Sequence, residues 1–436
     1  MPAVQYTQQL AGRALIFASA MFAANFSVWT LYAVLGVEIR GQLDLSATEY
    51  GVLLAAPILS GALLRFPVGL LVEYFSAKKL ILLQMLLLLP VLFLLPFIDS
   101  YGAHLLAGLW LGISGVSFVL GIRYISPWFE RGRQGTAMGI FGAGNAGAAI
   151  TLALAPAIQN WFGREWIGPA YGAGIILMMV LFEFFAPEET RYMRSRGKPD
   201  LRSHLKPLTQ IRVWRYGLYY YFVFGSFLAL LLWLPNYYLS VYQVSTPVAM
   251  ALTLLFVALS SSLRALGGWF ADRYGARTVN WSVFWTCLVC LFFLSYPPTS
   301  MTIHGVERDV HLNIEVGIEL FTLLLLVIGI AQGFGRASVY KALHDNFPAH
   351  MGSVGGTVAT IGALGGFTLP VLFGIAQDLV GIHSAAFMLL YGVLAICMLV
   401  MYLAIQRENY MQRLQYAQQN NFLLEETSET EALPDR

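Results

Sequence analysis

Long apolar segments dominate this chain and leave few folds open to it. About twelve runs of roughly 20 apolar residues follow one another, and most are separated by short polar connections. A helix of that length is long enough to cross a hydrocarbon core of about 30 Å. We predict spans near residues 14–36, 47–72, 79–98, 102–127, 135–160, 168–186, 216–240, 246–271, 278–296, 314–343, 352–376 and 383–406. The sequence thus predicts an all-α membrane protein with about twelve transmembrane helices.

Composition excludes most other classes of protein. Hydrophobic residues make up 58% of the chain and charged residues only 11%, too little charge to cover a soluble surface of this size. Cys287 and Cys290 have metal-site spacing, but no histidine or carboxylate lies nearby in the sequence. We find no nucleotide-binding loop, nucleophile triad or metal cluster. We therefore expect no enzyme activity, no cofactor and no metal, and the net charge of +2 does not indicate a nucleic-acid partner.

Basic residues concentrate in alternate connections. The longest internal polar stretch, residues 188–215, carries eight of them: Arg191, Arg194, Arg196, Lys198, Arg202, Lys206, Arg212 and Arg215. The other basic connections hold Lys78 and Lys79, Arg131 and Arg133, and Arg273 and Arg277. Because positive charge stays on the cytoplasmic side of a membrane, both termini and the basic loop are predicted to be cytoplasmic.

The basic loop also predicts a division of the chain. We expect an N-terminal six-helix half at 1–187, a linker at 188–215, a C-terminal six-helix half at 216–406 and a disordered polar tail at 407–436.

An internal repeat supports two related halves. At the end of span two, Arg65 lies four residues before Gly69, and Glu73 lies four residues after it. Span eight repeats this spacing with Arg264, Gly268 and Asp272, and Arg273 follows directly.

Paired six-helix repeats of this kind are the architecture of the major facilitator superfamily. The loop after span eight resembles that superfamily's cytoplasmic signature, whereas the first copy departs from it at Tyr74 and Ser76. The resemblance implies the major facilitator superfamily fold.

Arg65 and Arg264 are the main candidates for a binding site. Each lies eight residues before the acid of its loop motif, which places it roughly 12 Å into the membrane. A charge at that depth costs about 3 kcal/mol or more, so it is rarely incidental. The two arginines are expected to face each other across a central cavity and bind an anion, because a guanidinium donates parallel hydrogen bonds to a flat oxyanion. The alternative is that each arginine caps backbone carbonyls or pairs with an acid elsewhere.

Glycines recur at helical spacing in spans five and eleven. The stripes include Gly142, Gly144 and Gly147, and then Gly362, Gly365 and Gly366. Such stripes let helices approach closely, so packing is the role expected for most of them. Asn145 interrupts the first stripe with an amide, which suits a substrate oxygen; its alternative role is also packing.

The stretch Gly139 to Ala149 resembles the nitrate signature of the nitrate/nitrite porter family, and Gly362 to Pro370 resembles its second copy. The resemblance implies that Arg65 and Arg264 clamp nitrate and that Asn145 contacts it. It also implies that Tyr220 and Phe224 of span seven sandwich the flat anion. Two segments, Gly139 to Ala149 in span five and Gly335 to Lys341 in span ten, resemble the proton-coupled branch of the family more closely than the nitrate/nitrite exchangers.

Three further cations, Arg123, Arg336 and Lys341, lie in spans four and ten. They are candidates for a gate or a second anion site, or else ordinary helix-end cations.

The resulting functional hypothesis is nitrate uptake across a bacterial inner membrane by alternating access, with the proton as coupling ion. Nitrate/nitrite exchange stays open, because no carboxylate is expected near the middle of the membrane to carry a proton. Transport of oxalate or formate and a non-transporting nitrate receptor are the remaining alternatives.

Overall fold

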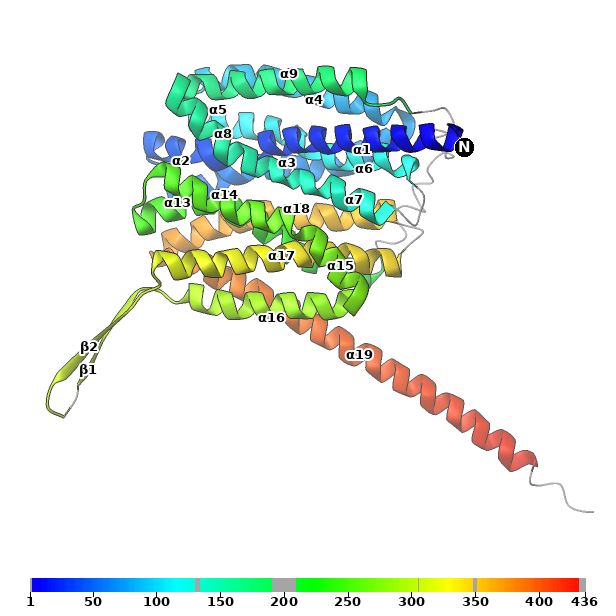
Figure 1. Cartoon of the computed structure of the whole chain (residues 1–436). Helices are drawn as coiled ribbons and strands as arrows, with labels where there is room; N and C mark the ends of the chain where they lie inside the picture. The colour runs from blue at the N-terminus through cyan, green and yellow to red at the C-terminus, as the bar shows by residue number, and fades with distance from the viewer. Residues whose placement is uncertain (1, 130–133, 190–208, 305, 348–350, 431–436) are drawn as a thin grey trace, which may run out of the picture.

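The computed structural model describes residues 2–129, 134–189, 209–304, 306–347 and 351–430. Within these ranges, twelve helical segments are long and apolar enough to cross a membrane, as the sequence predicted. They lie side by side in one bundle, with the N-terminus and the end of the last helix at one end (Figure 1). We call this end the terminal side and the opposite end the hairpin side.

The first half of the bundle holds six spans. Its elements are α1 (Pro2–Trp29), α2 (Tyr32–Leu43), α3 (Ala47–Tyr74), α4 (Ala77–Leu94), η1 (Leu95–Phe97), α5 (Tyr101–Leu111), η2 (Gly112–Val116), α6 (Ser117–Ile125), η3 (Ser126–Trp128), α7 (Gln134–Gly142), η4 (Ala143–Ala146), α8 (Gly147–Phe162), η5 (Arg164–Trp166) and α9 (Ile167–Phe185). Short 3-10 segments interrupt spans four and five at η2 and η4.

The second half holds the other six spans. Its elements are α12 (Ile211–Tyr220), η7 (Tyr221–Gly225), α13 (Ser226–Tyr242), α14 (Thr246–Ser262), α15 (Arg264–Tyr274), α16 (Ala276–Ser295), β1 (Thr299–His304), β2 (Asp309–Ile314), α17 (Ile318–Asn346), α18 (Met351–Val380) and α19 (Ala385–Thr430). Span seven contains a π-helical segment, η7, and span eight is broken between α14 and α15.

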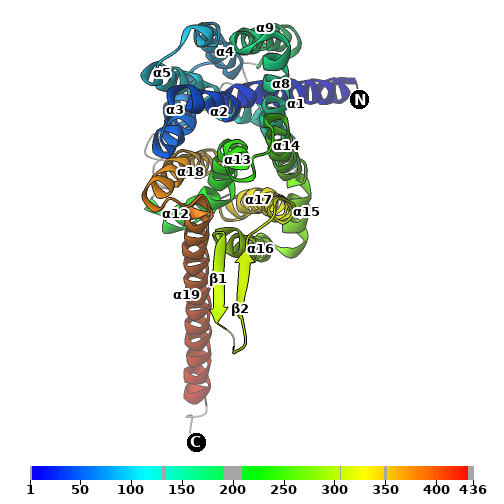
Figure 2. The ribbon, with the colours of Figure 1, turned by 90° about the vertical axis from the view of Figure 1, so that its left-hand side faces the viewer.

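The two halves meet mainly along two pairs of helices. Viewed from the hairpin side, the helices of the first half form one group and those of the second half another (Figure 2). Helix α3 packs against α18, and α8 packs against α14. Two glycines permit the first contact: a Cβ at Gly51 would lie 2.3 Å from the carbonyl oxygen of Pro370, and one at Gly374 would lie 2.2 Å from that of Ala47. The backbones of α3 and α18 therefore touch directly.

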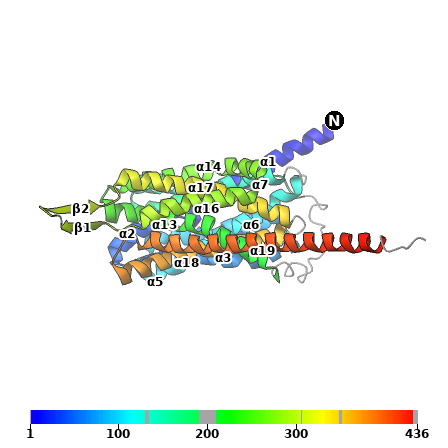
Figure 3. The same cartoon turned by 90° about the horizontal axis from the view of Figure 1, so that it is seen from below.

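Two elements were not expected from the sequence. Strands β1 and β2 pair antiparallel and extend beyond the bundle, with Met301 opposite Leu312 (Figure 1). The polar tail after residue 407 was predicted to be disordered, but α19 continues as a helix to Thr430 and leaves the bundle on the terminal side (Figure 3). Its alanine, leucine, glutamine and glutamate residues are strong helix formers, which accounts for this difference. Most of the predicted basic linker, residues 190–208, lies outside the described ranges.

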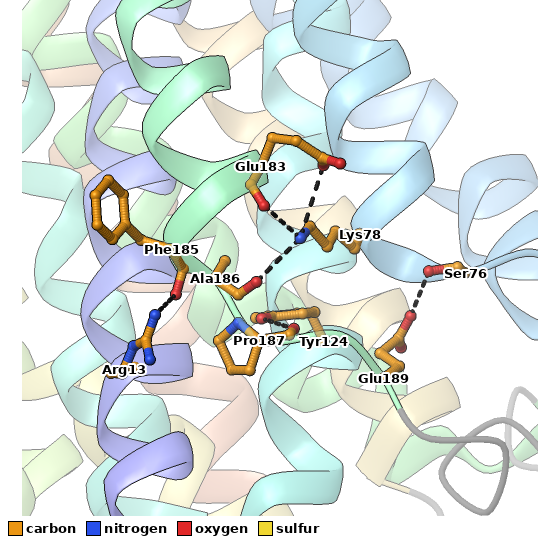
Figure 4. A network of polar contacts seen from close by, with 9 residues as sticks. All are labelled: Arg13, Ser76, Lys78, Tyr124, Glu183, Phe185, Ala186, Pro187 and Glu189. Atoms are coloured by element: carbon orange, nitrogen blue, oxygen red, sulfur yellow. Dashed lines mark hydrogen bonds and ion pairs between the residues drawn. The ribbon is translucent and has the colours of Figure 1, made fainter.

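Cations cap the terminal-side end of α9. Lys78 Nζ donates to the carbonyl oxygens of Glu183 (2.7 Å) and Ala186 (3.0 Å), and Arg13 donates to that of Phe185 (2.9 Å) (Figure 4). The last carbonyls of a helix have no partner within it, and a cation also complements the negative end of the helix dipole. Lys78, from the basic connection after span two, thus joins spans three and six.

On the hairpin side, a carboxylate of one half caps a helix of the other. Asp378 of α18 accepts hydrogen bonds from the backbone N–H groups of Ala47 (3.1 Å) and Thr48 (2.7 Å), and from the Thr48 hydroxyl (2.5 Å). Nearby, the ring of Tyr50 packs on Trp233 at 5.5 Å between centroids. These contacts close the bundle on this side.

Replacing Asp378 with alanine should lower the melting temperature of the detergent-solubilised protein, because loss of a helix cap costs about 1–2 kcal/mol. Asp99, an exposed residue between η1 and α5 on the same side without a described hydrogen bond to its side chain, provides the control D99A, which should melt as the wild type does. If D378A also melts at the wild-type temperature, the cap contributes nothing to closure.

Candidate functional site

A small cavity lies where the two halves meet. Its lining comes from spans one, two, four, five, seven, eight and eleven: Phe22, Phe26, Arg65, Phe118, Asn145, Tyr220, Phe224, Arg264 and Ala359. All five residues predicted to bind substrate are among them. Within the described part of the chain, this lining contains no aspartate or glutamate.

Arg65 is buried in the wall that α3 contributes, with 4% of its surface exposed. Its Nη1 donates to the carbonyl of Ala359 across the interface (2.9 Å), and its Nε donates to the carbonyl of Gly115 in η2 (3.3 Å). Its guanidinium also lies 5.1 Å from the ring centroid of Trp29 and 5.5 Å from that of Phe118. Two of the N–H groups of Arg65, on Nη1 and Nε, therefore do cap backbone carbonyls, as the alternative role predicted. Carbonyls and ring faces carry no full charge, so the positive charge itself stays unneutralised.

Arg264 is the first residue of α15, directly after the break in span eight. Among the described residues its side chain has no hydrogen-bond or ion-pair partner. Its guanidinium reaches the first half: a Cβ at Gly142 would lie 3.0 Å from Nη1 and 3.2 Å from Cζ. The missing side chain at Gly142 thus leaves room for this charge at the interface.

Asn145 lies in η4, the 3-10 segment of span five, and is 2% exposed. Its amide lines the cavity, and within the described ranges it has no hydrogen-bond partner. A buried amide without partners is costly, since each polar group lost from water needs a new hydrogen bond. An oxygen-bearing ligand would satisfy the N–H groups of this amide.

Tyr220 is the last residue of α12, and Phe224 lies within the π-helical segment η7 that follows it in span seven. Their rings stack at 5.2 Å between centroids, with 23° between the ring planes. This spacing is normal for two rings in contact, so no flat anion fits between them in this arrangement. The sandwich implied by the sequence resemblance is absent here, and the two rings form one aromatic wall.

The arrangement suits a small anion. Two guanidinium groups and one amide, all hydrogen-bond donors, meet in a site otherwise lined by aromatic rings and one alanine. Electrostatic attraction is strong where water is excluded, and each guanidinium keeps free N–H groups for a planar oxyanion.

The remaining signature glycines lie at close helix contacts. A Cβ at Gly147 would lie 2.1 Å from the carbonyl oxygen of Ala23, and one at Gly144 would lie 2.5 Å from the ring of Phe22. In span eleven, Gly362, Gly365 and Gly366 lie correspondingly close to Tyr220, Gly225 and Leu228 of span seven. Span five thus packs on span one as span eleven packs on span seven.

The loop motif of the second half lies on the terminal side, away from the cavity lining. Asp272 is 3.6 Å from Lys341, and Arg273 lies over the rings of Trp269 and Tyr274. The side chain of Glu73, its counterpart in the first half, is outside the described residues. A Cβ at Gly268 would make only an ordinary contact, 4.0 Å from Ala337.

The three further cations occupy separate surroundings. Lys341 pairs with the carboxylate of Asp345 (2.6 Å) as well as with Asp272. Arg336 is fully buried and donates to Ser260 of α14, whereas Arg123 lies on α6 in the other half. A second anion site built from these cations stays a prediction.

Sequence reasoning missed four residues of the lining: Phe22, Phe26, Phe118 and Ala359. Each is an apolar residue within an apolar span, so no local signal distinguishes it from its neighbours.

Comparison with known proteins places the chain among transporters. Residues 17–367 match the family described as the Major Facilitator Superfamily. The "Probable nitrate/nitrite antiporter NarK1" of Thermus thermophilus is 35% identical over 407 residues, which cover 90% of this chain and 91% of that protein. The "Nitrite extrusion protein" of Bacillus subtilis is 28% identical over 368 residues, which cover 84% and 88%.

The fold is also that of a solved transporter. A bacterial homologue of the human lysosomal transporter Spinster, in an inward-facing and occupied conformation, superimposes with a TM-score of 0.70 at 14% identity. The match covers 90% of this chain and 96% of that chain.

Adding one methyl group beside Arg264 should disturb the site. Gly142→Ala should weaken binding of a small oxyanion to the purified protein, because the new Cβ displaces the guanidinium. Gly139→Ala, three residues earlier on α7, is the matched control, since nothing lies within 4 Å of its Cβ position. Equal anion affinity in both variants, measured by calorimetric titration, would show that Arg264 is not held at this interface.

Proposed function

Because the chain belongs to the nitrate/nitrite porter family of the Major Facilitator Superfamily, we propose that it carries nitrate across a bacterial inner membrane by alternating access. The cavity supports this proposal most directly: Arg65 and Arg264 come from opposite halves and line one small space with Asn145. In the proposed orientation, which rests on the basic loops, both termini and the terminal side are cytoplasmic.

The proposed mechanism uses nitrate as the bridge between the halves. Nitrate accepts hydrogen bonds from Arg65 of span two and Arg264 of span eight and reduces the repulsion between their charges. Asn145 donates to a third oxygen, and the wall of Tyr220 and Phe224 covers a face of the planar anion. With the anion bound, the halves rock about the cavity and expose it to the other side of the membrane.

For coupling, the cavity favours exchange of nitrate for nitrite. Two arginines with no carboxylate in the described lining make the empty carrier reluctant to change conformation, because their charges then stay uncompensated in the membrane. An anion on the return step removes that barrier. The alternative is proton symport. The segments Gly139 to Ala149 and Gly335 to Lys341 favour it, because they resemble the proton-coupled branch of the family.

Other small anions are alternative substrates. Oxalate or formate would also bind paired guanidinium groups. Asn145 favours nitrate over formate, since nitrate offers a third oxygen to the amide while the two arginines hold the others. Oxalate has four oxygens but is larger than nitrate, and the small size of the cavity favours nitrate over it.

Replacing either clamp arginine with lysine should abolish most nitrate uptake into proteoliposomes. Lysine keeps the charge but loses the planar pair of donors, so both Arg65→Lys and Arg264→Lys are tested. Arg13→Lys, which changes an arginine of α1 outside the cavity lining, is the control. Near-wild-type counterflow of labelled nitrate in a well-folded R65K or R264K variant would contradict the proposed binding site.

Coupling is decided by uptake of labelled nitrate under an imposed pH gradient, with and without nitrite inside the vesicles. Exchange predicts uptake only with internal anion and no response to the gradient. Accumulation in vesicles without internal anion, driven by the pH gradient, would contradict exchange and establish symport. Competition by unlabelled oxalate or formate in the same vesicles tests the substrate class.

A further inference from the structure

One buried charge is not used by the proposed site. Arg336 of α17 has no exposed surface. Its Nη2 donates to the carbonyl (2.8 Å) and the hydroxyl (2.7 Å) of Ser260, and its Nε donates to the carbonyl of Gln332 (3.3 Å). Its guanidinium carbon lies 4.1 Å from the ring centroid of Phe227. The side chain is thus fixed on several sides within the second half.

The charge of Arg336 is uncompensated. Among the described residues no carboxylate pairs with it, and its Nη1 is buried without a hydrogen bond. The neighbouring Oε1 of Gln332 is also buried without a partner. A lone charge in an apolar interior is destabilising and is seldom retained without a role.

The position of Arg336 connects it to Arg264, one of the two arginines proposed to bind the anion. Ser260 lies four residues before Arg264, in the last turn of α14 before the break in span eight. After the break in span eight, α15 packs tightly on α17, since a Cβ at Gly267 would lie 2.4 Å from the Cα of Phe334. Arg336 also lies over the ring of Phe227, three residues after Phe224 of the cavity lining, although Arg336 is not part of that lining itself.

We propose that Arg336 is a positioning residue of the anion site. It holds the turn from which Arg264 enters the cavity, and its own unpaired charge increases the attraction for an anion that it does not touch. The inference rests on the proposed function, because it assigns Arg336 a role toward the same anion. The second half then contributes two positive charges to the anion site. Arg264 lines the cavity, and Arg336 lies behind that lining.

Three variants separate charge from structure. Arg336→Gln removes the charge but keeps N–H donors for Ser260, and Arg336→Lys keeps the charge. Gln332→Glu leaves Arg336 in place and neutralises it with an adjacent carboxylate of nearly the same shape. Ser338→Ala is the control, because Ser338 is also buried on α17 but bonds to Asn280 (2.6 Å).

The readout is counterflow of labelled nitrate in proteoliposomes, with KM and Vmax measured separately. We expect R336Q and Q332E each to raise KM about tenfold while Vmax changes less than about twofold, and R336K to stay within about threefold of the wild-type KM. S338A should leave KM unchanged.

A wild-type KM in Q332E, or in a folded R336Q, would overturn the inference. So would an R336K variant whose KM rises as much as that of R336Q, since charge would then be irrelevant. Q332E keeps the test valid should R336Q fail to fold. Failure of the wild-type protein to transport nitrate would instead overturn the proposed function.

Discussion

Buried arginine charge without an acidic partner among the described residues is the constraint on which this structure depends. Arg65 and Arg264 bring two positive charges to one small aromatic cavity, and Arg336 adds a third behind its wall. Each such charge costs about 3 kcal/mol or more at this depth in a membrane. Carbonyl oxygens and ring faces offset part of that cost but remove no charge. In the proposed function, a bound anion offsets the rest.

The bundle is arranged so that this cavity draws on both halves. Arg65 is held by carbonyls of η2 and of α18 in the other half, and Arg264 crosses toward Gly142. Irregular helix segments lie at the cavity: η2 and η4 are 3-10 helical, and η7 is π-helical. Each interrupts a regular span at the level of the site, where a carbonyl, amide or ring must point inward. The hairpin side, by contrast, is joined by backbone contacts and by the cap of Asp378 on α3.

Much of this arrangement could be predicted from the sequence. Span number follows from the length of the apolar runs, and the depth of Arg65 and Arg264 follows from their spacing to the loop motifs. Arg65, Arg264 and Asn145 were candidates from their residue types and placement, Tyr220 and Phe224 only from the resemblance, and the structure brings all five to one cavity. Their contacts depend on packing between segments far apart in the chain, which local patterns do not encode. The stacking of Tyr220 on Phe224, the bond from Arg65 to Ala359 and the place of Phe118 in the wall are all of this kind. The β1–β2 hairpin has a local signal, since polar and apolar residues alternate through β2, but it was missed because it lies in a connection between two long apolar spans that dominate the pattern.

In the proposed mechanism, one nitrate ion bridges arginines of the two halves. A pair of cryo-electron microscopy maps of the protein in lipid nanodiscs, one with nitrate and one without nitrate or nitrite, tests this bridge. We expect additional density between the guanidinium groups of Arg65 and Arg264, within hydrogen-bond distance of both and of the Asn145 amide, only in the map with nitrate. Identical maps at this position, or nitrate density bound by neither arginine, would contradict it.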